Sequence, residues 1–219
     1  MSHTNPVDAD TIRITKLFPT PIASVSVPDY LNLNAQLRDA ILRRAAETTG
    51  VSHSNEGGWQ SAEDFSEWSG PAGQALIAFG QSFVNQLSAV ISPEHGLIEA
   101  NLQWTFSAWA NISTQGHSNS LHGHPGSYWS GVYWVDDGHE FPAAEVSGEI
   151  VFHDPRGLMP TLLSPSVRMK IEGCLSAGLS HKINPTSGTF LIFPSWLLHA
   201  VNRYDGQGTR ISVAFNFAV

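Results

Sequence analysis

The sequence predicts a mainly β domain with two N-terminal helices, and three observations lead to this prediction. The second half of the chain contains several short runs of β-branched and aromatic residues separated by turn residues, which is typical of a β-sandwich or barrel. The chain as a whole has 19 glycines and 13 prolines, which favours many turns. Two segments in the first half instead repeat their apolar residues with helical spacing.

No internal repeat and no linker rich in proline and serine divides the 219 residues. We therefore expect one domain over residues 1–219, because this length fits a single large domain. Within it, residues 1–99 would supply strands and two supporting helices. Residues 100–219 would form the β core.

The N-terminal part is expected to contain two strands followed by two helices. Apolar and polar residues alternate over 11–18, and after two prolines a strand can resume over 22–27. Residues 31–47 and 72–91 each place their apolar side chains on one stripe, as helices that pack on a sheet do. The loop 51–70 between them carries tryptophans and a histidine, and is a candidate rim of a pocket.

The strands of the β core are predicted from alternation and from short apolar runs bounded by turn residues. They are expected over residues 101–112, 128–135, 149–153, 167–171, 179–183, 189–193, 197–202 and 209–217. A polar loop is expected over 113–120. A second loop, over 136–146, is the other candidate rim of a pocket.

Composition excludes several classes of function. The net charge of −8 and the pI near 5.6 argue against a nucleic-acid partner. The single cysteine, Cys174, excludes an intramolecular disulfide. No basic segment followed by an apolar one resembles a signal peptide, and no apolar run is long enough to cross a membrane. We expect a cytoplasmic protein without a membrane partner.

Two histidines, His122 and His124, stand two residues apart just before the strand expected at 128–135. Residues i and i+2 of an extended chain point the same way, so both imidazoles could serve one metal ion. The alternative is a polar loop that contains histidines by chance, since the chain has ten. A third candidate ligand is His199, 75 residues beyond His124, although a lone histidine on an apolar strand is more often a core residue.

An arginine and a serine, Arg210 and Ser212, share the polar side of the last strand. Its other side carries only apolar residues, so this arginine is expected to be buried. A buried guanidinium requires an anion, and arginine beside a hydroxyl suits a bidentate carboxylate. The alternative is an internal salt bridge, for instance to Asp136 or Asp154.

Taken in order, these motifs resemble the Fe(II)/2-oxoglutarate-dependent oxygenases. The matching residues are His122-Gly123-His124, Ser130-Gly131-Val132-Tyr133, 148–152, 185–194, His199 and Arg210-Ile211-Ser212. The resemblance covers roughly residues 100–219. More narrowly, residues 122–135 are similar to a set of bacterial and phage oxygenases of this superfamily with a His-x-His-Pro motif.

This resemblance implies a fold, a reaction and cofactors. The fold would be a double-stranded β-helix, the jelly-roll barrel also found in cupins. The protein would be a dioxygenase, an oxidoreductase that uses iron as Fe(II), O2 and 2-oxoglutarate as co-substrate. It would couple oxidative decarboxylation of 2-oxoglutarate to succinate with oxidation of a substrate C–H bond. The substrate would be an unidentified small molecule or peptide, and a homodimer is a family-level expectation.

The resemblance also implies roles for individual residues. His122 and His199 match two metal ligands. Arg210 matches the residue that binds the far carboxylate of 2-oxoglutarate, with Ser212 beside it. Tyr133 or Trp134 lies where a co-substrate contact is often found, and only one of them can face it because adjacent residues of a strand point opposite ways.

The sequence departs from the family pattern at His124, where the superfamily usually has a carboxylate. A third histidine would leave the iron site one charge more positive. Alternatively, Asp154 supplies the carboxylate from elsewhere in the chain. Two further readings stay open: a cupin-like three-histidine metalloenzyme that does not use 2-oxoglutarate, and a non-catalytic jelly-roll binding module.

Overall fold

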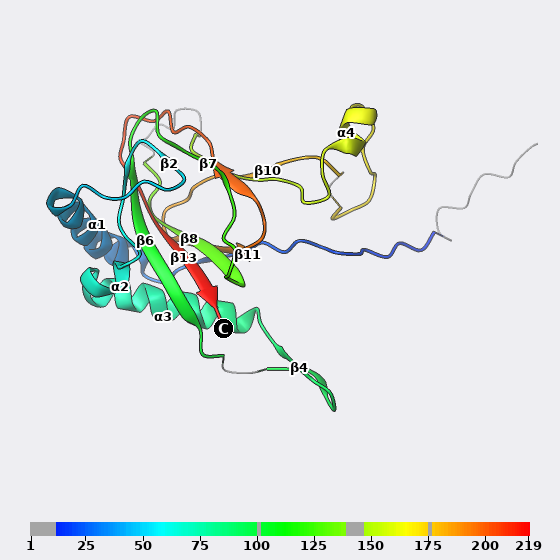
Figure 1. The fold of residues 1–219 in the computed structure, drawn as a ribbon, viewed down its shortest axis with the longest axis horizontal. Coiled ribbons are helices and arrows are strands. Elements are labelled where there is room, and N and C mark those ends of the chain that lie inside the picture. The colour runs from blue at the N-terminus through cyan, green and yellow to red at the C-terminus, as the bar shows by residue number, and fades with distance from the viewer. Residues whose placement is uncertain (1–11, 100–101, 139–146, 175–176) are drawn as a thin grey trace, which may run out of the picture.

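The computed structural model describes residues 12–99, 102–138, 147–174 and 177–219. Two antiparallel sheets face each other and form the core (Figure 1). The larger sheet has the strand order β1 (Ala23–Ser26), β11 (Thr189–Pro194), β8 (Trp129–Asp136), β13 (Arg210–Ala218), β6 (Thr105–Ser113) and β3 (Trp59–Gln60). The smaller sheet has the order β10 (His181–Ile183), β9 (Ile150–Phe152), β12 (His199–Val201), β7 (Ser118–His122) and β2 (Asn55–Glu56). This is the jelly-roll, double-stranded β-helix architecture that we expected.

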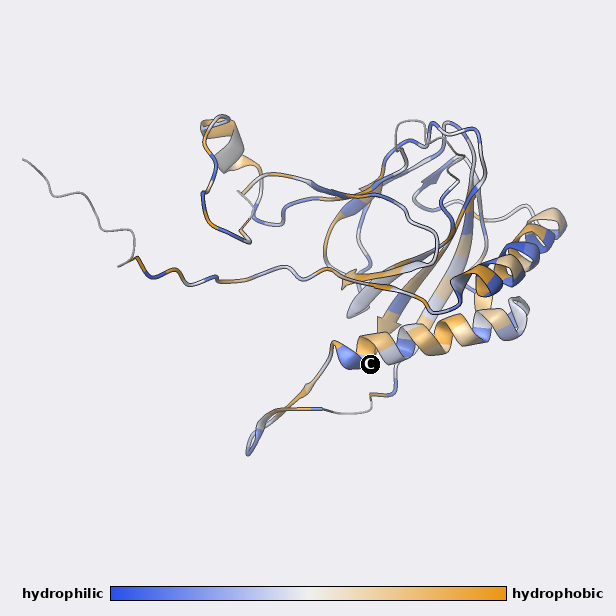
Figure 2. Ribbon diagram, turned by 180° about the vertical axis from the view of Figure 1, so that it is seen from behind, coloured by the Kyte–Doolittle hydropathy of each residue, from blue (hydrophilic) through white to orange (hydrophobic). Residues whose placement is uncertain are grey.

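Within the described residues, four helices accompany the sheets: α1 (Tyr30–Glu47), α2 (Phe65–Trp68), α3 (Gly70–Gln86) and α4 (Met159–Leu163). The two long helices pack on the outer face of the larger sheet, and α3 consists largely of apolar residues (Figure 2). A Cβ added to Gly80 would lie 3.0 Å from ring carbons of Phe190 and Phe217, so α3 contacts the sheet closely. Leu76 of α3 is fully buried at this contact, and its truncation to alanine is expected to cost about 2–5 kcal/mol.

Helix α1 is fixed to the sheet through Asn34. Its side-chain amide donates a hydrogen bond to the Val135 carbonyl at 2.7 Å, and its carbonyl accepts one from the Tyr133 hydroxyl. Both partners are in β8, and all three side chains are buried. These hydrogen bonds satisfy polar groups that would otherwise be costly between a helix and a sheet.

The two faces of the larger sheet have different contacts: one packs against the helices and the other faces the smaller sheet. In β8, Tyr133 and Val135 pack against the helices, whereas Trp134 faces the smaller sheet. In β11, Phe190 likewise packs against the helices and Leu191 faces the smaller sheet. The outward face therefore makes the main hydrophobic core, and the inward face is left to line the space between the sheets.

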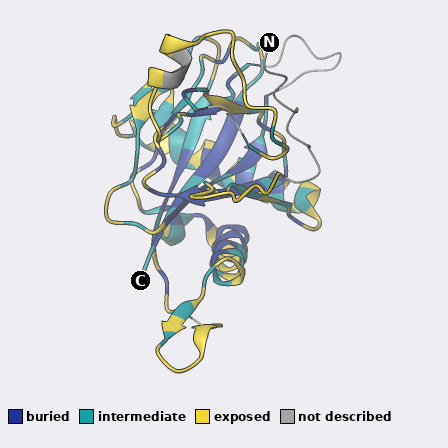
Figure 3. Cartoon of the chain, turned by 90° about the vertical axis from the view of Figure 1, so that its right-hand side faces the viewer, coloured by how far each residue is buried: buried dark blue, intermediate teal, exposed yellow. Residues whose placement is uncertain are grey.

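Several expected elements are absent or shorter. Described residues 12–18 form no strand, although residue 11 lies outside the described part, and no strand forms over 167–171. Both segments alternate, but alternation alone makes no strand without a neighbouring strand to pair with. The helix predicted over 72–91 is α3, which ends at Gln86. The residues beyond it form a hairpin of β4 (Val90–Ser92) and β5 (Gly96–Ile98). This hairpin and the region of α4 are largely exposed (Figure 3).

Other elements were not expected. Strand β7 occupies part of the segment predicted as a polar loop, and β2, β3 and α2 lie within the loop 51–70. Much of the loop predicted over 136–146 lies outside the described residues, at 139–146. No helix in the described part of the chain is both long and apolar enough to cross a membrane.

Candidate metal centre

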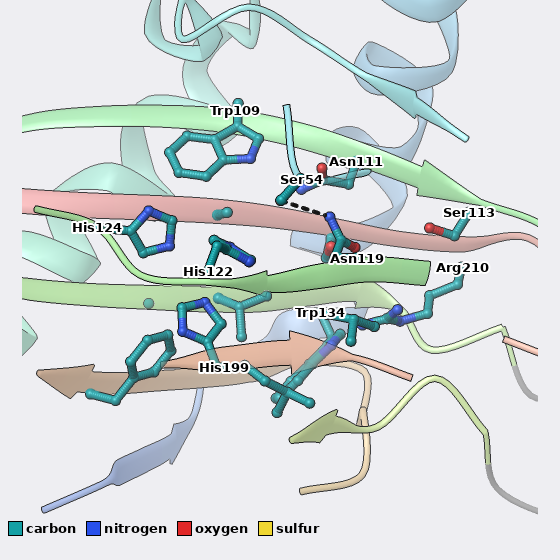
Figure 4. Close-up of a pocket in the computed structure, with 17 residues that line it drawn as sticks. Ser54, Trp109, Asn111, Ser113, Asn119, His122, His124, Trp134, His199 and Arg210 are labelled. Carbon is teal, nitrogen blue, oxygen red and sulfur yellow. Dashed lines mark hydrogen bonds between the residues drawn. The ribbon is translucent and has the colours of Figure 1, made fainter. Parts of the chain in front are cut away.

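The structure brings His122, His124 and His199 together at one end of the space between the sheets (Figure 4). His122 ends β7 and His199 begins β12, and the two residues are direct partners in the antiparallel pairing of these strands. His124 follows two residues after His122, where its backbone N–H donates to the Ser195 carbonyl at 3.0 Å. Each ring offers a nitrogen within 4.8 Å of those of the other two, a spacing that could hold a metal ion.

Two of the rings are oriented by backbone carbonyls. Nδ1 of His122 lies 2.7 Å from the carbonyl oxygen of Ser120, and Nδ1 of His199 lies 2.9 Å from that of Leu197. A carbonyl can only accept, so each Nδ1 carries a proton and donates it. The other nitrogen, Nε2, is then unprotonated and can act as a ligand, as in metal sites where the second nitrogen of each histidine is hydrogen-bonded.

Electrostatics also favour neutral rings. Burial, reinforced by the neighbouring His122, lowers the pKa of His199 to about 3. The same two causes lower the pKa of His124 to about 4. At neutral pH both imidazoles are uncharged, which is the form that binds metal ions.

A cavity extends from the three histidines between the sheets to Arg210 (Figure 4). It contains about 610 Å³ of empty space, including its opening to solvent. Ser212 lines it two residues beyond Arg210 on β13, so both side chains face the smaller sheet as the alternation predicts. The distant arginine and the histidine cluster are therefore two ends of one site.

Arg210 is buried without an ion pair among the described residues. It is 5% exposed, and its Nε has no hydrogen-bond partner within the described part of the chain. Burial lowers its pKa to about 10, although Tyr204 and Asp137 oppose this shift. The internal salt bridges considered from the sequence are absent, because Asp136 pairs with Arg38 and Asp154 with Arg156. A buried cation of this kind is costly unless a ligand supplies the anion.

Asp154 does not join the histidines. Its carboxylate accepts hydrogen bonds from the side chain of Arg156 at 2.8 and 2.9 Å and from the backbone N–H of Gly178 at 2.8 Å. These hydrogen bonds keep the pKa of Asp154 below its ordinary value, although burial opposes them. The group of ligand atoms found in the described residues includes His124 and not this carboxylate.

Trp134 and Tyr133 lie on opposite faces of β8. Trp134 is fully buried against the cavity, and its indole N–H has no hydrogen-bond partner among the residues that the structure describes. Tyr133 faces the helices, where its hydroxyl donates to Asn34 and where burial raises its pKa far above the ordinary value. Of the two candidates for a co-substrate contact, only Trp134 lies in the cavity with Arg210.

Sequence reasoning missed several polar residues of the cavity. Asn111 and Trp109 of β6 face it two residues apart, and Asn119 of β7 donates a hydrogen bond to Ser54 at 3.2 Å. The i, i+2 spacing of Trp109 and Asn111 in a predicted strand was a usable signal. Asn119 gave none, because its strand has the composition of a loop.

A second, outer cavity lies on the solvent side of His122 and His124. Residues of the loop 51–70 form one wall of it, including His53, Gln60 and Glu63. The expectation that this loop borders a pocket is therefore confirmed. Its tryptophans instead pack inward: Trp59 donates its indole N–H to the carbonyl of Thr48, and Trp68 to Asp64.

Comparison with known proteins identifies the family to which the chain belongs. Residues 107–216, half of the chain, match the family model described as "Putative 2OG-Fe(II) oxygenase". The chain belongs to this family of 2OG-Fe(II) oxygenases. It is therefore an oxidoreductase that depends on Fe(II) and 2-oxoglutarate, as the resemblance implied.

Solved structures share the fold of this oxygenase at low sequence identity. A prolyl-4-hydroxylase from Pseudomonas putida is 16% identical, with a TM-score of 0.58 over 91% of this chain and 92% of that one. A prolyl hydroxylase from Trichoplax adhaerens is 12% identical, with a TM-score of 0.59 over 90% and 83%. HygX from Streptomyces hygroscopicus, solved with nickel and 2-oxoglutarate bound, is 12% identical, with a TM-score of 0.56 over 91% and 83%. No curated protein matches the sequence.

Proposed function

We propose that this oxygenase holds Fe(II) through Nε2 of His122, His124 and His199 and binds the far carboxylate of 2-oxoglutarate with Arg210. The observation that carries this proposal is the buried guanidinium of Arg210, without an ion pair among the described residues, in the same cavity as three imidazoles whose ring nitrogens lie close together. A buried cation that forms no ion pair among the described residues at one end, and a set of metal ligands at the other, suit a chelating dianion.

The donor set fits the metal. Imidazole nitrogen is a common ligand of Fe(II), and three ligands on one side of an ion leave positions open for co-substrate and oxygen. Because His124 replaces the usual carboxylate, the protein ligands bring no negative charge to the ion. The two carboxylates of 2-oxoglutarate would then offset two of the three positive charges of the metal and Arg210. When bound, Fe(II) provides the redox chemistry that couples loss of CO2 from 2-oxoglutarate to oxidation of a substrate C–H bond.

The protein itself positions the co-substrate and excludes water. Arg210 can donate two parallel hydrogen bonds to a carboxylate, with the Ser212 hydroxyl beside it. The unpartnered indole N–H of Trp134 supplies a further donor in the same cavity. Val132, Ile150 and Phe193 give the cavity an apolar wall, which strengthens these charged contacts by keeping water out.

The substrate would approach through the outer cavity, which borders both His122 and His124. Its walls offer an indole, an imidazole, an amide and a carboxylate, from Trp109, His53, Gln60 and Glu63. This mixture suits a polar small molecule or a peptide segment. The homodimer and the cytoplasmic location expected from the sequence stay predictions.

The proposal is tested by measuring succinate release from labelled 2-oxoglutarate in the presence of Fe(II) and O2. We expect slow, iron-dependent turnover without added substrate, and its loss in His199→Ala. His181→Ala is a matched control, since His181 is exposed on β10 and lines neither cavity. A protein that binds metal but neither binds nor consumes 2-oxoglutarate would instead be a cupin-like metalloenzyme, and one that binds no metal would be a binding module.

A further inference from the structure

The Nδ1 atoms of the three histidines, which face away from the proposed metal position, have different partners. His122 and His199 are held by backbone carbonyls, which no substitution removes. Nδ1 of His124 instead faces a side chain, with the amide nitrogen of Asn216 3.4 Å away. The orientation of this third ring therefore depends on a residue for which we have so far given no role.

Asn216 is placed by the same strand as the co-substrate arginine. It lies on β13 in register with Arg210 and Ser212, six and four residues before it, so all three point to the inner face. Its amide oxygen accepts a hydrogen bond at 2.7 Å from the hydroxyl of Ser130, its partner residue on β8. Ser130 is 1% exposed and therefore holds the amide in one plane.

The direction of the contact with His124 has a chemical consequence. An amide N–H that donates to Nδ1 requires this nitrogen to be unprotonated, and the proton of a neutral ring is then on Nε2. Such a tautomer cannot ligate through Nε2. Ligation requires a proton on Nδ1, and that proton needs an acceptor, which among the described contacts of Nδ1 can only be the oxygen of the same amide.

We propose that Asn216, oriented by Ser130, is a positioning residue that sets His124 as the third metal ligand by turning its amide over. In the metal-free protein, the amide N–H donates to Nδ1 and the serine hydroxyl donates to the amide oxygen. In the metal-bound protein, Nδ1–H donates to the amide oxygen and the amide N–H donates to the serine hydroxyl. One proton leaves Nε2 and one joins Nδ1, so the ring stays neutral.

The two ends of an amide have nearly the same shape, and a hydroxyl can both donate and accept, so the exchange needs no rearrangement of the strands. Hydrogen bonds to the second nitrogen of a ligating histidine typically change metal affinity by about 10- to 100-fold. Because this inference rests on the proposed three-histidine site, its test must separate the two claims.

The test is a titration of the purified full-length protein with Co(II), followed by visible absorption and calorimetry. Asn216→Leu, which cannot accept, is expected to bind Co(II) about 10- to 100-fold more weakly and with an altered spectrum. Asn216→Asp, which accepts only and adds a negative charge, is expected to bind about 10-fold more tightly. Ser130→Ala is expected to change Co(II) affinity by less than about 3-fold, because the hydrogen bond that it loses is present in both arrangements.

Asn202→Leu is the matched control, because Asn202 is a partly buried asparagine that donates to Glu149 at 3.1 Å and lines neither cavity. Unchanged Co(II) affinity in Asn216→Leu, or weaker binding in Asn216→Asp, overturns the inference. If Asn216→Leu fails to fold, the tighter binding expected for Asn216→Asp still decides. His122→Ala separates the claims: if it binds Co(II) like the wild type, the three-histidine site itself is wrong.

Discussion

Replacing Arg210 by methionine removes the positive charge and the hydrogen-bond donors while keeping much of the side-chain length. In the native structure this guanidinium is 5% exposed and forms no ion pair within the described residues. Its lowered pKa, caused mainly by burial, means that the charged form costs the folded protein free energy. The substitution should therefore impair ligand binding without impairing folding.

The expected loss can be estimated from the kind of contact. Hydrogen bonds to charged groups contribute about 1.5–3 kcal/mol each, and truncating one partner of a buried charged pair costs about 2–5 kcal/mol. At 1.4 kcal/mol for each factor of ten, this range is about 30- to 4,000-fold. We expect about 100-fold weaker binding of 2-oxoglutarate, because the other end of the molecule keeps its contacts at the metal centre.

The assay is anaerobic titration of the metal-loaded protein with 2-oxoglutarate, read from tryptophan fluorescence, since Trp109 and Trp134 line the cavity. Metal affinity is measured in parallel and should not fall. The melting temperature of the ligand-free Arg210→Met protein should equal or exceed that of the wild type. Arg38→Met is the matched control: Arg38 of α1 pairs with Asp136 of β8 and does not line the cavity, so the substitution should leave 2-oxoglutarate affinity unchanged.

Two results would refute this reasoning. If Arg210→Met binds 2-oxoglutarate as the wild type does, the arginine is not the carboxylate site. If the substitution instead lowers the melting temperature by many degrees, Arg210 makes a structural ion pair in the folded protein.

The remaining predictions concern the neighbours of this site. Trp134→Phe removes an unpartnered indole N–H from the cavity, so 2-oxoglutarate should bind about 3- to 10-fold more weakly with no loss of stability; calorimetric titration and thermal melting check this. Tyr133→Phe should do the reverse, because it loses the hydrogen bond to Asn34 on the helix side: unfolding free energy should fall by about 1 kcal/mol in urea, while 2-oxoglutarate affinity stays the same. His124→Asp lowers the charge of the ligand set by one and should bind Fe(II) more tightly than the wild type in anaerobic competition with a chelator; complete loss of binding would mean that a carboxylate cannot reach the ion from this position.

Much of the β core could be predicted because its strands carry a two-residue pattern on both faces. The alternation of 209–217 already placed Arg210 and Ser212 together on one side, and adjacent Tyr133 and Trp134 on opposite sides. The structure shows the same facing. Where a strand has a neighbour to pair with, its alternation was enough to predict which side chains face the cavity.

The sequence pattern could not predict which strands pair with each other. His199 lies beside His122 because β12 pairs with β7, and β7 is composed of serine, asparagine, leucine and histidine, which read as a loop. Conversely, residues 12–18 alternate like a strand but have no strand beside them in the described structure. The hydrogen bonds that fix the tautomers of His122 and His199 depend on backbone positions and carry no signal in residue type.

The most direct test of the account is a crystal structure of the protein with Fe(II) and 2-oxoglutarate bound under anaerobic conditions. The account predicts that Nε2 of His122, His124 and His199 coordinate the ion and that the far carboxylate of 2-oxoglutarate contacts Arg210. A coordination sphere in which a carboxylate such as that of Asp154 replaces His124, or a 2-oxoglutarate carboxylate that does not contact Arg210, would contradict it.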